Sequence, residues 1–259
     1  MITQEIHNPT FKSDSAMSPI IEINGLHKSF GIGNDILKGV SLTVAKGENL
    51  VVLGKSGSGK SVTIKCLVGL VTADAGEIKV FDTDITSLNY KQLNEIRLRI
   101  GFLFQNAALY DSMTVRENLA FPLSRHSKKL STTEINDAIL ETLESVGLED
   151  AVDKMPSELS GGMRKRIGLA RTLILKPEII LYDEPTTGLD TITSREISEL
   201  ILAIQKKSKT TSMIITHDMA CAKLTGDRIV ILKEGKIEAE GTYETLEKSN
   251  DEWVRSFFI

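Results

Sequence analysis

Two patterns of apolar residues alternate along the chain from residue 19 onward. Short continuous apolar runs, which favour strands buried on both faces, occur at residues 48–53, 179–182 and 212–216. Segments that favour helices lie between them, at residues 61–70 and 194–207. Because strands and helices alternate, we expect an α/β fold whose mostly parallel sheet is covered on both faces.

Several residues mark where further elements begin and end. Ser131 and Glu134 form a capping-box pattern before a helix that Gly147 would stop, and one face of that helix carries Ile135, Ile139, Leu143 and Val146. A second helix is predicted from about residue 161 to 175, because the residue before Pro177 is biased away from helix. Further strands are predicted at residues 20–23, 36–44 and 77–81, with a hairpin over 227–239 that turns at Glu234 and Gly235.

Composition excludes several classes of protein. The chain has 259 residues, with 31 Lys and Arg against 35 Asp and Glu, and a formal net charge of −4 disfavours a general polyanion binder. Cys66 and Cys221 are too few for a four-cysteine zinc site and fit a reducing compartment. Residues 1–18 are polar and aperiodic, which predicts a disordered tail. No run is long enough to cross a bilayer and the start lacks a signal-peptide pattern, so we expect a soluble cytoplasmic chain that reaches a membrane only through a partner.

A phosphate-binding loop follows the strand predicted at residues 48–53. Its sequence is Gly54-Lys55-Ser56-Gly57-Ser58-Gly59-Lys60-Ser61, which fits the pattern GxxxxGK[ST]. The glycines let backbone N–H groups converge on phosphate oxygens, and the following helix directs its positive end at the anion. We expect Lys60 to neutralise the β- and γ-phosphates and Ser61 to ligate Mg²⁺, with Val62 completing the nucleotide site. The alternative is an ordinary glycine-rich turn.

Acidic residues follow the apolar strand at residues 179–182. In a nucleotide site Asp183 would hold Mg²⁺, and Glu184 would act as the general base on a water in line with the γ-phosphate. His217 ends another predicted strand, where its imidazole would reach the γ-phosphate. A lone histidine at a strand end is otherwise a structural residue.

A second candidate anion site precedes the helix predicted at residues 161–175. Leu159-Ser160-Gly161-Gly162-Met163 combines a small hydroxyl, two glycines and a helix N-terminus. Because one phosphate loop already serves one nucleotide, this turn suggests an ATP held between two copies of the chain. The alternative is an ordinary helix cap at Ser160.

In their order these elements resemble the ATP-binding-cassette (ABC) ATPases, from residue 20 to about 241. Leu159–Met163 looks like the family signature, although Met163 stands where Gln is commoner, and residues 182–190 resemble the Walker B segment and D-loop. The resemblance makes Gln105 the Q-loop ligand of Mg²⁺ and water, and makes Asp190 a contact across a dimer. It puts Phe30 where an aromatic ring stacks on adenine; the alternative for Phe30 is a place in the core.

The resemblance implies a P-loop NTPase fold with bound ATP and Mg²⁺. We expect a RecA-like core at residues 19–105 and 166–245, an N-terminal antiparallel β subdomain and a helical subdomain inserted at about 106–165. Residues 246–259 would form a C-terminal tail. Two copies would close around two ATP molecules and drive transmembrane permease subunits on the inner face of the cell membrane.

A finer resemblance covers residues 101–123 and 188–193. They are similar to the corresponding segments of MlaF-type ATPases of the Mla/Mce phospholipid transport systems. This implies phospholipid cargo, an Mce-type substrate-binding protein and a small accessory subunit as partners. It also implies a docking groove for the permease, formed by Leu109, Tyr110, Met113, Val115 and Phe121. Alternatively, these residues only close the helical subdomain.

Three rival functions differ in class. A nucleic-acid-tethering ATPase of the same superfamily would carry coiled coils or zinc modules between Lys60 and Ser160, and this sequence has neither, so we expect no nucleic-acid partner. An ABC subunit for another cargo, such as an amino acid, a metal complex or an exported molecule, stays open. A non-hydrolysing binding module is disfavoured by Glu184 and His217.

Two other clusters have structural explanations. Arg164, Lys165, Arg166 and Arg171 form a basic cluster that we expect to be a solvated helix face. Trp253, Val254, Phe257 and Phe258 give the C-terminus unusual apolar weight, and we expect them to pack on the chain's own core. Docking on an accessory subunit or on a second copy is the alternative for this group.

Overall fold

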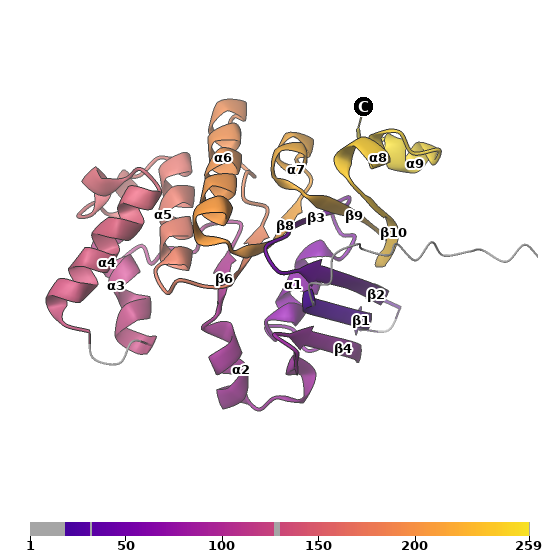
Figure 1. Cartoon of the computed structure of the whole chain (residues 1–259), viewed down its shortest axis with the longest axis horizontal. Coiled ribbons are helices and arrows are strands. Elements are labelled where there is room, and N and C mark those ends of the chain that lie inside the picture. Colours follow the sequence, from indigo (N-terminus) through magenta and orange to yellow (C-terminus); the bar gives the residue numbers. More distant parts are fainter. Residues whose placement is uncertain (1–18, 32, 127–129, 259) are drawn as a thin grey trace, which may run out of the picture.

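The computed structural model describes residues 19–31, 33–126 and 130–258, so the predicted tail at residues 1–18 lies outside the described residues. The chain forms two sheets with helices around them (Figure 1). In the described part of the chain, no helix combines the length and the apolar character needed to span a bilayer.

A six-stranded sheet occupies the middle of the molecule in the order β10-β9-β3-β8-β7-β6. Within this order, each adjacent pair of strands from β9 through β3, β8 and β7 to β6 is parallel. Strand β10 pairs with β9 in the antiparallel direction. This confirms the α/β fold with a mostly parallel sheet. The strands are β3 (Asn49–Leu53), β6 (Ile100–Leu103), β7 (Ile179–Asp183), β8 (Thr211–Thr216), β9 (Arg228–Lys233) and β10 (Lys236–Gly241).

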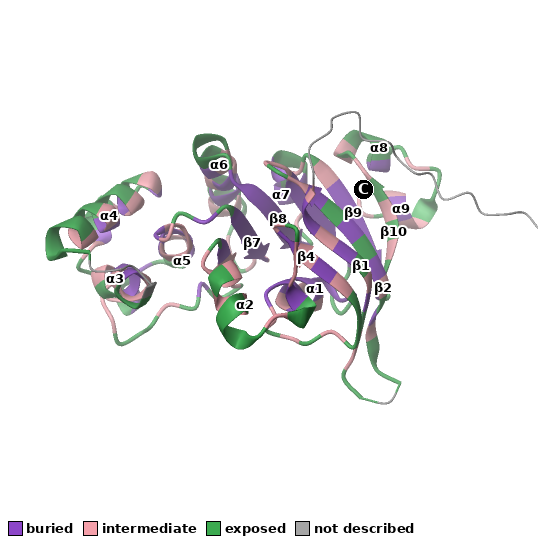
Figure 2. Ribbon diagram, turned by 60° about the horizontal axis from the view of Figure 1, so that its bottom comes forward, coloured by how far each residue is buried: buried purple, intermediate pink, exposed green. Residues whose placement is uncertain are grey.

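A four-stranded antiparallel sheet covers one side of the central sheet. It corresponds to the N-terminal antiparallel β subdomain that was predicted. Its order is β2-β1-β4-β5, with β1 (Pro19–Ser29), β2 (Asp35–Ala45), β4 (Ala75–Val80) and β5 (Thr83–Asp84). Between the two sheets lies α1 (Lys60–Leu67), whose Ile64 and Leu67 join residues of both sheets in one apolar core. Figure 2 shows buried, intermediate and exposed residues mixed along the strands of this antiparallel sheet, whose outer face is exposed.

Four helices cover the opposite face of the central sheet. They are α6 (Thr191–Ser208), α7 (Met219–Thr225), α8 (Tyr243–Glu247) and α9 (Glu252–Arg255), and all contribute to a second apolar core. Alternate strand residues divide between the faces: Val52 joins the first core and Val51 the second. A strand buried on both faces has to be apolar throughout, which explains the continuous runs in the sequence.

The C-terminal aromatic residues pack on the chain's own core, as predicted. Val254 is fully buried, and Trp253, Phe257 and Phe258 pack against the second core. The Lys233 ammonium lies 4.2 Å from the centroid of the Trp253 ring. Helix α9 and the end of α8 lie in the segment predicted as a tail, residues 246–259 (Figure 1).

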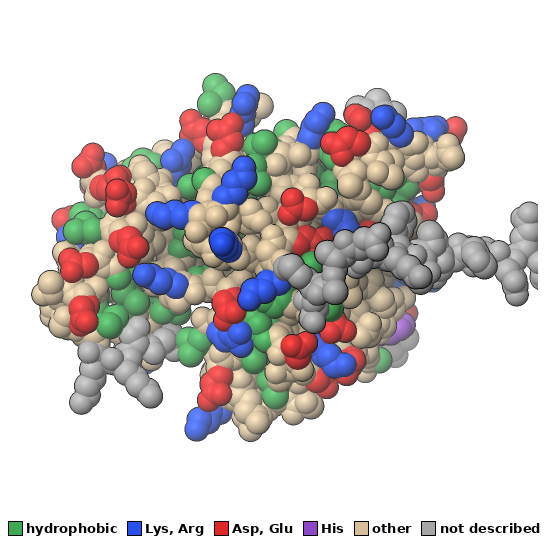
Figure 3. Space-filling view, viewed as in Figure 1, with side chains coloured by type: hydrophobic (Ala, Val, Ile, Leu, Met, Phe, Trp, Pro, Cys, Tyr) green, Lys and Arg blue, Asp and Glu red, His purple; other side chains and the backbone are tan. Residues whose placement is uncertain are grey.

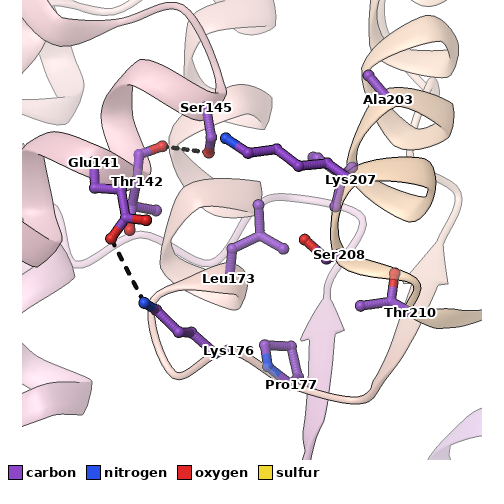
Figure 4. A pocket seen from close by; sticks show the side chains of 11 residues that line it. Glu141, Thr142, Ser145, Leu173, Lys176, Pro177, Ala203, Lys207, Ser208 and Thr210 are labelled. Atoms are coloured by element: carbon purple, nitrogen blue, oxygen red, sulfur yellow. Dashed lines mark hydrogen bonds and ion pairs between the residues drawn. The ribbon is translucent and has the colours of Figure 1, made fainter.

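Three helices form a third apolar core beside the β6 edge of the sheet (Figure 1). They are α3 (Val115–His126), α4 (Thr132–Ser145) and α5 (Gly161–Leu173). Helix α5 packs against α3 and α4 on one side and against α6 and β6 on the other. Between α4 and the end of α6 lies a cavity of about 410 Å³, spanned by an ion pair from Lys176 to Glu141 at 3.5 Å (Figure 4). Helix α5 is therefore the main packed connection between this group of helices and the sheet.

Local sequence signals account for several boundaries. The capping box of Ser131 and Glu134 is present in α4, and Gly147 has a φ of +66° just after the C-cap. The predicted hairpin turns at Glu234 and Gly235, with φ values of +47° and +81°. The sequence reading missed β6, α3 and α7, as well as α2 (Tyr90–Arg97).

A buried asparagine organises the loop that precedes α3. Asn118 is 0% exposed. Its Nδ2 donates to the carbonyl oxygens of Tyr110, Met113 and Thr114 at 3.0–3.1 Å, and its Oδ1 accepts from the Tyr110 N–H at 2.8 Å. One side chain therefore bonds the Tyr110 N–H and the Met113 carbonyl, which lie outside the helix and strand ladders, and so fixes residues 110–114 against the helix.

We expect Asn118→Ala to lower the free energy of unfolding by about 1–3 kcal/mol, because it leaves the Tyr110 N–H and the Met113 carbonyl without the partner that Asn118 provides. Urea unfolding followed by circular dichroism measures this change. Asn106→Ala, at an exposed position of the neighbouring loop, is the control and should change stability little. Equal stability of the two variants would show that the Asn118 bonds are not what holds the loop.

Candidate functional site

A cavity of about 640 Å³ lies at the carboxyl edge of the central sheet and collects most of the predicted site residues. Its lining comes from segments that are distant in the sequence: Phe30, Ile36, Lys55, Ser56, Gly57, Gly59, Lys60, Ser61, Val62, Gln105, Glu184 and His217. Three predicted site residues lie just behind this lining. The Gly54 carbonyl accepts from Lys60 and the Asp183 carboxylate accepts from Ser61, while Ser58 is buried within the loop. This arrangement joins one end of β3, β7 and β8 into a single site.

The loop from Gly54 to Ser61 connects β3 to α1 and packs too tightly for larger residues. A Cβ on Gly54 would come within 2.5 Å of the Leu232 carbonyl oxygen. Gly59 has a φ of +107°, and a Cβ there would lie 2.6 Å from Leu37. Both glycines are therefore required by close approach of the loop to neighbouring strands, which holds the start of α1 at the cavity.

Lys60 is buried beneath the loop. Its Nζ donates to the Gly54 carbonyl at 2.8 Å and to the Lys55 carbonyl at 3.3 Å, and it lies 3.7 Å from Glu184 Oε1. Burial lowers the pKa of the ammonium, while the nearby carboxylates of Glu184 and Asp183 oppose that shift. These bonds aim the charge along the loop, where an incoming phosphate would meet it.

Oxygen ligands for a hard cation meet at the start of α1. The Ser61 hydroxyl donates to Asp183 Oδ1 at 2.8 Å, and Gln105 lines the same cavity. The described residues contain no group of three or more His, Cys, Asp and Glu that would hold a metal by itself. A hydroxyl and a carboxylate fit Mg²⁺ that takes its other ligands from phosphates and water.

Glu184 is held in an unusual backbone conformation directly after β7. Its φ is +53°, and its N–H donates to the Ile215 carbonyl of β8 at 2.8 Å. Its carboxylate lies 2.8 Å from His217 Nδ1 and accepts from Thr187 Oγ1 at 3.3 Å. The structure therefore brings Glu184 and His217 together as a pair, with the His217 side chain 64% exposed to the cavity.

Phe30 stands at the mouth of the cavity. It is 53% exposed, so its alternative as a core residue is wrong. Lys28 Nζ lies 5.3 Å from the ring centroid and steadies one face. The exposed ring offers a flat apolar surface of the kind on which a nucleobase stacks.

The Ser160 turn is not part of the cavity. Ser160 caps α5 by accepting from the Met163 N–H at 3.2 Å, which is the ordinary cap that the sequence allowed. A Cβ on Gly162 would lie 2.6 Å from Thr193 Cγ2, so the glycine lets the start of α5 approach α6. Gly161 adjoins Leu189 in the same way, with a Cβ distance of 3.6 Å. Ser160, Gly161 and Gly162 therefore belong to a different surface from Lys60 within one chain.

Two members of the predicted basic cluster were misread. The Arg171 guanidinium is partly buried: its Nη1 is shielded from solvent and its Nη2 donates to the Ala107 carbonyl at 3.4 Å. Lys165 is 6% exposed rather than on a solvated face, and its Nζ donates to the carbonyl oxygens of Gln105 and Glu184. Burial lowers the pKa of this ammonium. The helical periodicity could have predicted this burial, because Lys165 shares a helix face with Gly168 and Leu169, which both pack inward.

Comparisons with known proteins agree with the geometry. The ABC transporter family matches residues 37–187. The chain is 44% identical over 241 residues to the probable ribonucleotide transport ATP-binding protein mkl of Mycobacterium tuberculosis, covering 93% of this chain and 67% of that protein. It is 40% identical over 255 residues to the chloroplastic protein TRIGALACTOSYLDIACYLGLYCEROL 3 of Arabidopsis thaliana, covering 92% and 73%.

Among solved structures, the fold is similar to a dimeric post-hydrolysis state of the ATP-binding cassette MJ0796 bound to ADP and Pi. The TM-score is 0.79 at 32% identity, with 86% of this chain and 98% of that chain covered. The likeness therefore extends over both sheets and the helices, beyond the residues matched by the family.

We expect Lys60→Ala to abolish measurable ATP binding, because it removes the buried charge that faces the loop. Titration calorimetry with ATP measures the affinity, and Lys91→Ala, an exposed lysine of α2, is the control. ATP affinity equal to that of the unaltered chain would contradict the phosphate-loop assignment.

Proposed function

Because this chain belongs to the ABC transporter family and is an ATPase of that family, we propose that it powers a permease that moves phospholipid across the cell envelope. The observation that carries the ATPase chemistry is the contact of Glu184 with Lys60 and His217 in one cavity. The phospholipid cargo is supported by the resemblance of residues 101–123 to MlaF-type ATPases, and a lipid cargo more generally by the galactolipid in the name of the Arabidopsis relative.

In this proposal each side chain has a separate task in hydrolysis. Lys60 holds the β- and γ-phosphates, and Glu184 accepts a proton from the attacking water. His217, bonded to the same carboxylate, orients it toward the γ-phosphate. Ser61, Asp183 and Gln105 would hold Mg²⁺, which supplies charge neutralisation at the phosphates when bound. Phe30 stacks on adenine at the mouth of the cavity.

The complete site needs two copies of the chain. The Ser160 turn lies outside the cavity that contains Lys60, so it is placed to cover the phosphates of a nucleotide on a second copy. ATP then favours the closed dimer because it contacts both copies only in that state. The dimeric ABC cassette of similar fold, MJ0796, supports this arrangement.

The permease contact is assigned to the loop and helix after Gln105. Tyr110 is 44% exposed, and its ring lies 5.1 Å from that of the half-buried Phe121 in an edge-on arrangement. Leu109 and Met113 are also half-buried, whereas Val115 is 0% exposed and belongs to the third core. The predicted groove is therefore wrong at Val115. Tyr110 is its most exposed member, and Leu109, Met113 and Phe121 are half-buried.

Partners and location follow from this assignment. The chain would lie on the cytoplasmic face of the cell membrane, held there by the permease, with an accessory subunit and an Mce-type protein in the same complex. Acidic and basic side chains are interspersed on the face shown in Figure 3, which fits a protein partner rather than nucleic acid.

A second cargo class is favoured by one comparison. The mycobacterial relative is named for ribonucleotide transport, so its name and that of the Arabidopsis relative point to different cargo. An ABC subunit for a polar cargo would contain the same nucleotide site. The two alternatives differ in the permease complex and not in the residues of the cavity.

We expect Glu184→Gln to retain ATP binding and to reduce turnover at least ~10²-fold, because it removes the general base. It should also trap a dimer in the presence of ATP, which gel filtration measures. Glu95→Gln, at an exposed position of α2, is the control. Turnover near that of the unaltered chain would remove Glu184 from the chemistry.

The same variant tests the cargo in a complex with the permease. In vesicles containing a fluorescent phospholipid, the unaltered complex should move the label in an ATP-dependent manner and the Glu184→Gln complex should not. ATPase activity stimulated by a ribonucleotide or an amino acid, with no movement of phospholipid, would favour the second cargo class.

We expect Phe121→Asp to fold normally and to lose the permease in a pull-down, because a carboxylate would enter the apolar contact with Tyr110. Tyr90→Asp changes an aromatic residue that is 76% exposed on α2 and should leave the complex intact. Survival of the complex in both variants would show that residues 106–123 are not the docking surface.

A further inference from the structure

Lys165 combines deep burial with backbone acceptors. The side chain projects from α5 between the ends of β6 and β7, and its two acceptors in the described part of the chain are the carbonyl oxygens of Gln105 and Glu184. Taking an ammonium out of water costs several kcal/mol unless its bonds offset the loss, so a buried lysine of this kind is rare without a function.

The two carbonyl groups lie where strands leave the sheet. β6 and β7 pair up to Leu103 and Tyr182, and Gln105 and Glu184 each follow two residues later. Carbonyl groups at these positions have passed the end of the ladder and need partners from elsewhere. The Lys165 ammonium supplies one partner to both and so fixes the distance between the two segments.

The Glu184 peptide is held from two sides. Its N–H donates to Ile215 of β8, and its carbonyl accepts from Lys165 at 3.1 Å. A non-glycine residue at a φ of +53° is strained and persists only when its surroundings hold it. The same carbonyl also accepts from the Thr187 N–H at 3.3 Å, so Lys165 adds a second, charged donor, and its loss would weaken the hold on this conformation.

The same helix links this bond to the Ser160 turn. Lys165 lies five positions after Ser160, which is about 7.5 Å along a helix at about 1.5 Å per residue. Helix α5 also provides the main packed connection between α3, α4 and the sheet, since a cavity separates α4 from the end of α6 (Figure 4). Movement of α5 therefore moves the Lys165 ammonium relative to Gln105 and Glu184.

We propose that Lys165 is a positioning residue for hydrolysis, which ties the backbone of Gln105 and Glu184 to the helix that starts at the Ser160 turn. The proposal rests on the proposed function, because it needs Glu184 to act on a water. Hydrolysis at the nucleotide bound by one copy would then depend on helix α5 of that copy. The first turn of the same helix would cover the nucleotide bound by the second copy.

The test compares turnover with ATP affinity in the full chain. We expect Lys165→Met to lower kcat about 10-fold or more, since a misplaced base loses rate steeply. The dissociation constant for ATP, from titration calorimetry, should stay within about 2-fold. Lys165→Arg should recover part of the rate, because a guanidinium also donates to carbonyl groups. The control is Lys176→Met, which removes a lysine whose side chain is 78% exposed.

A second measurement separates positioning from a general loss of structure. In the Glu184→Gln background, Lys165→Met should still give the ATP-trapped dimer, because the Ser160 turn and Lys60 are unchanged. If Lys165→Met does not fold, Lys165→Gln replaces it. An unchanged kcat, or a loss of ATP affinity or of the trapped dimer, would overturn the proposal. Absence of hydrolysis in the unaltered chain would instead refute the proposed function and this proposal with it.

Discussion

The parallel register of β3, β7 and β8 is the constraint on which the candidate site depends. Strands that run side by side in one direction release their following residues at the same edge of a sheet. That edge is where Lys60, Glu184 and His217 meet, although long helical segments separate them in the sequence. Slippage of one strand by a single residue would turn its side chains to the opposite face and break up this group.

Features encoded within a few residues were predictable. The glycine spacing of the phosphate loop, the capping box at Ser131 and Glu134 and the hairpin at Glu234 and Gly235 all depend on local geometry. The continuous apolar runs predicted the central strands correctly, because a strand that is buried on both faces needs apolar residues throughout. Asp183, the last residue of β7, and Glu184 after it could also be placed in the site, because neighbouring parallel strands bring their carboxyl ends to the same edge of the sheet.

Features that depend on distant contacts were not predictable. Val115 looks like any apolar residue of a surface loop, yet the packing of α3 against α4 and α5 buries it fully. Lys165 is a charged residue in a basic run, and only the approach of Gln105 and Glu184 gives its ammonium acceptors inside the protein. Asn118 likewise depends on a loop that folds back over its helix. Each was misread or passed over because its partners come from other segments.

Asp190 already makes three hydrogen bonds within the single chain. Its Oδ1 accepts from the N–H groups of Ile192 and Thr193 at 3.0 Å, and its Oδ2 accepts from the Thr193 hydroxyl at 2.7 Å. The carboxylate therefore serves as the N-cap of α6. Since Oδ2 accepts only this one bond and Asp190 is exposed, a donor from another molecule can bind Oδ2 without displacing the first turn of α6, and the carboxylate would then join that molecule directly to the start of the helix.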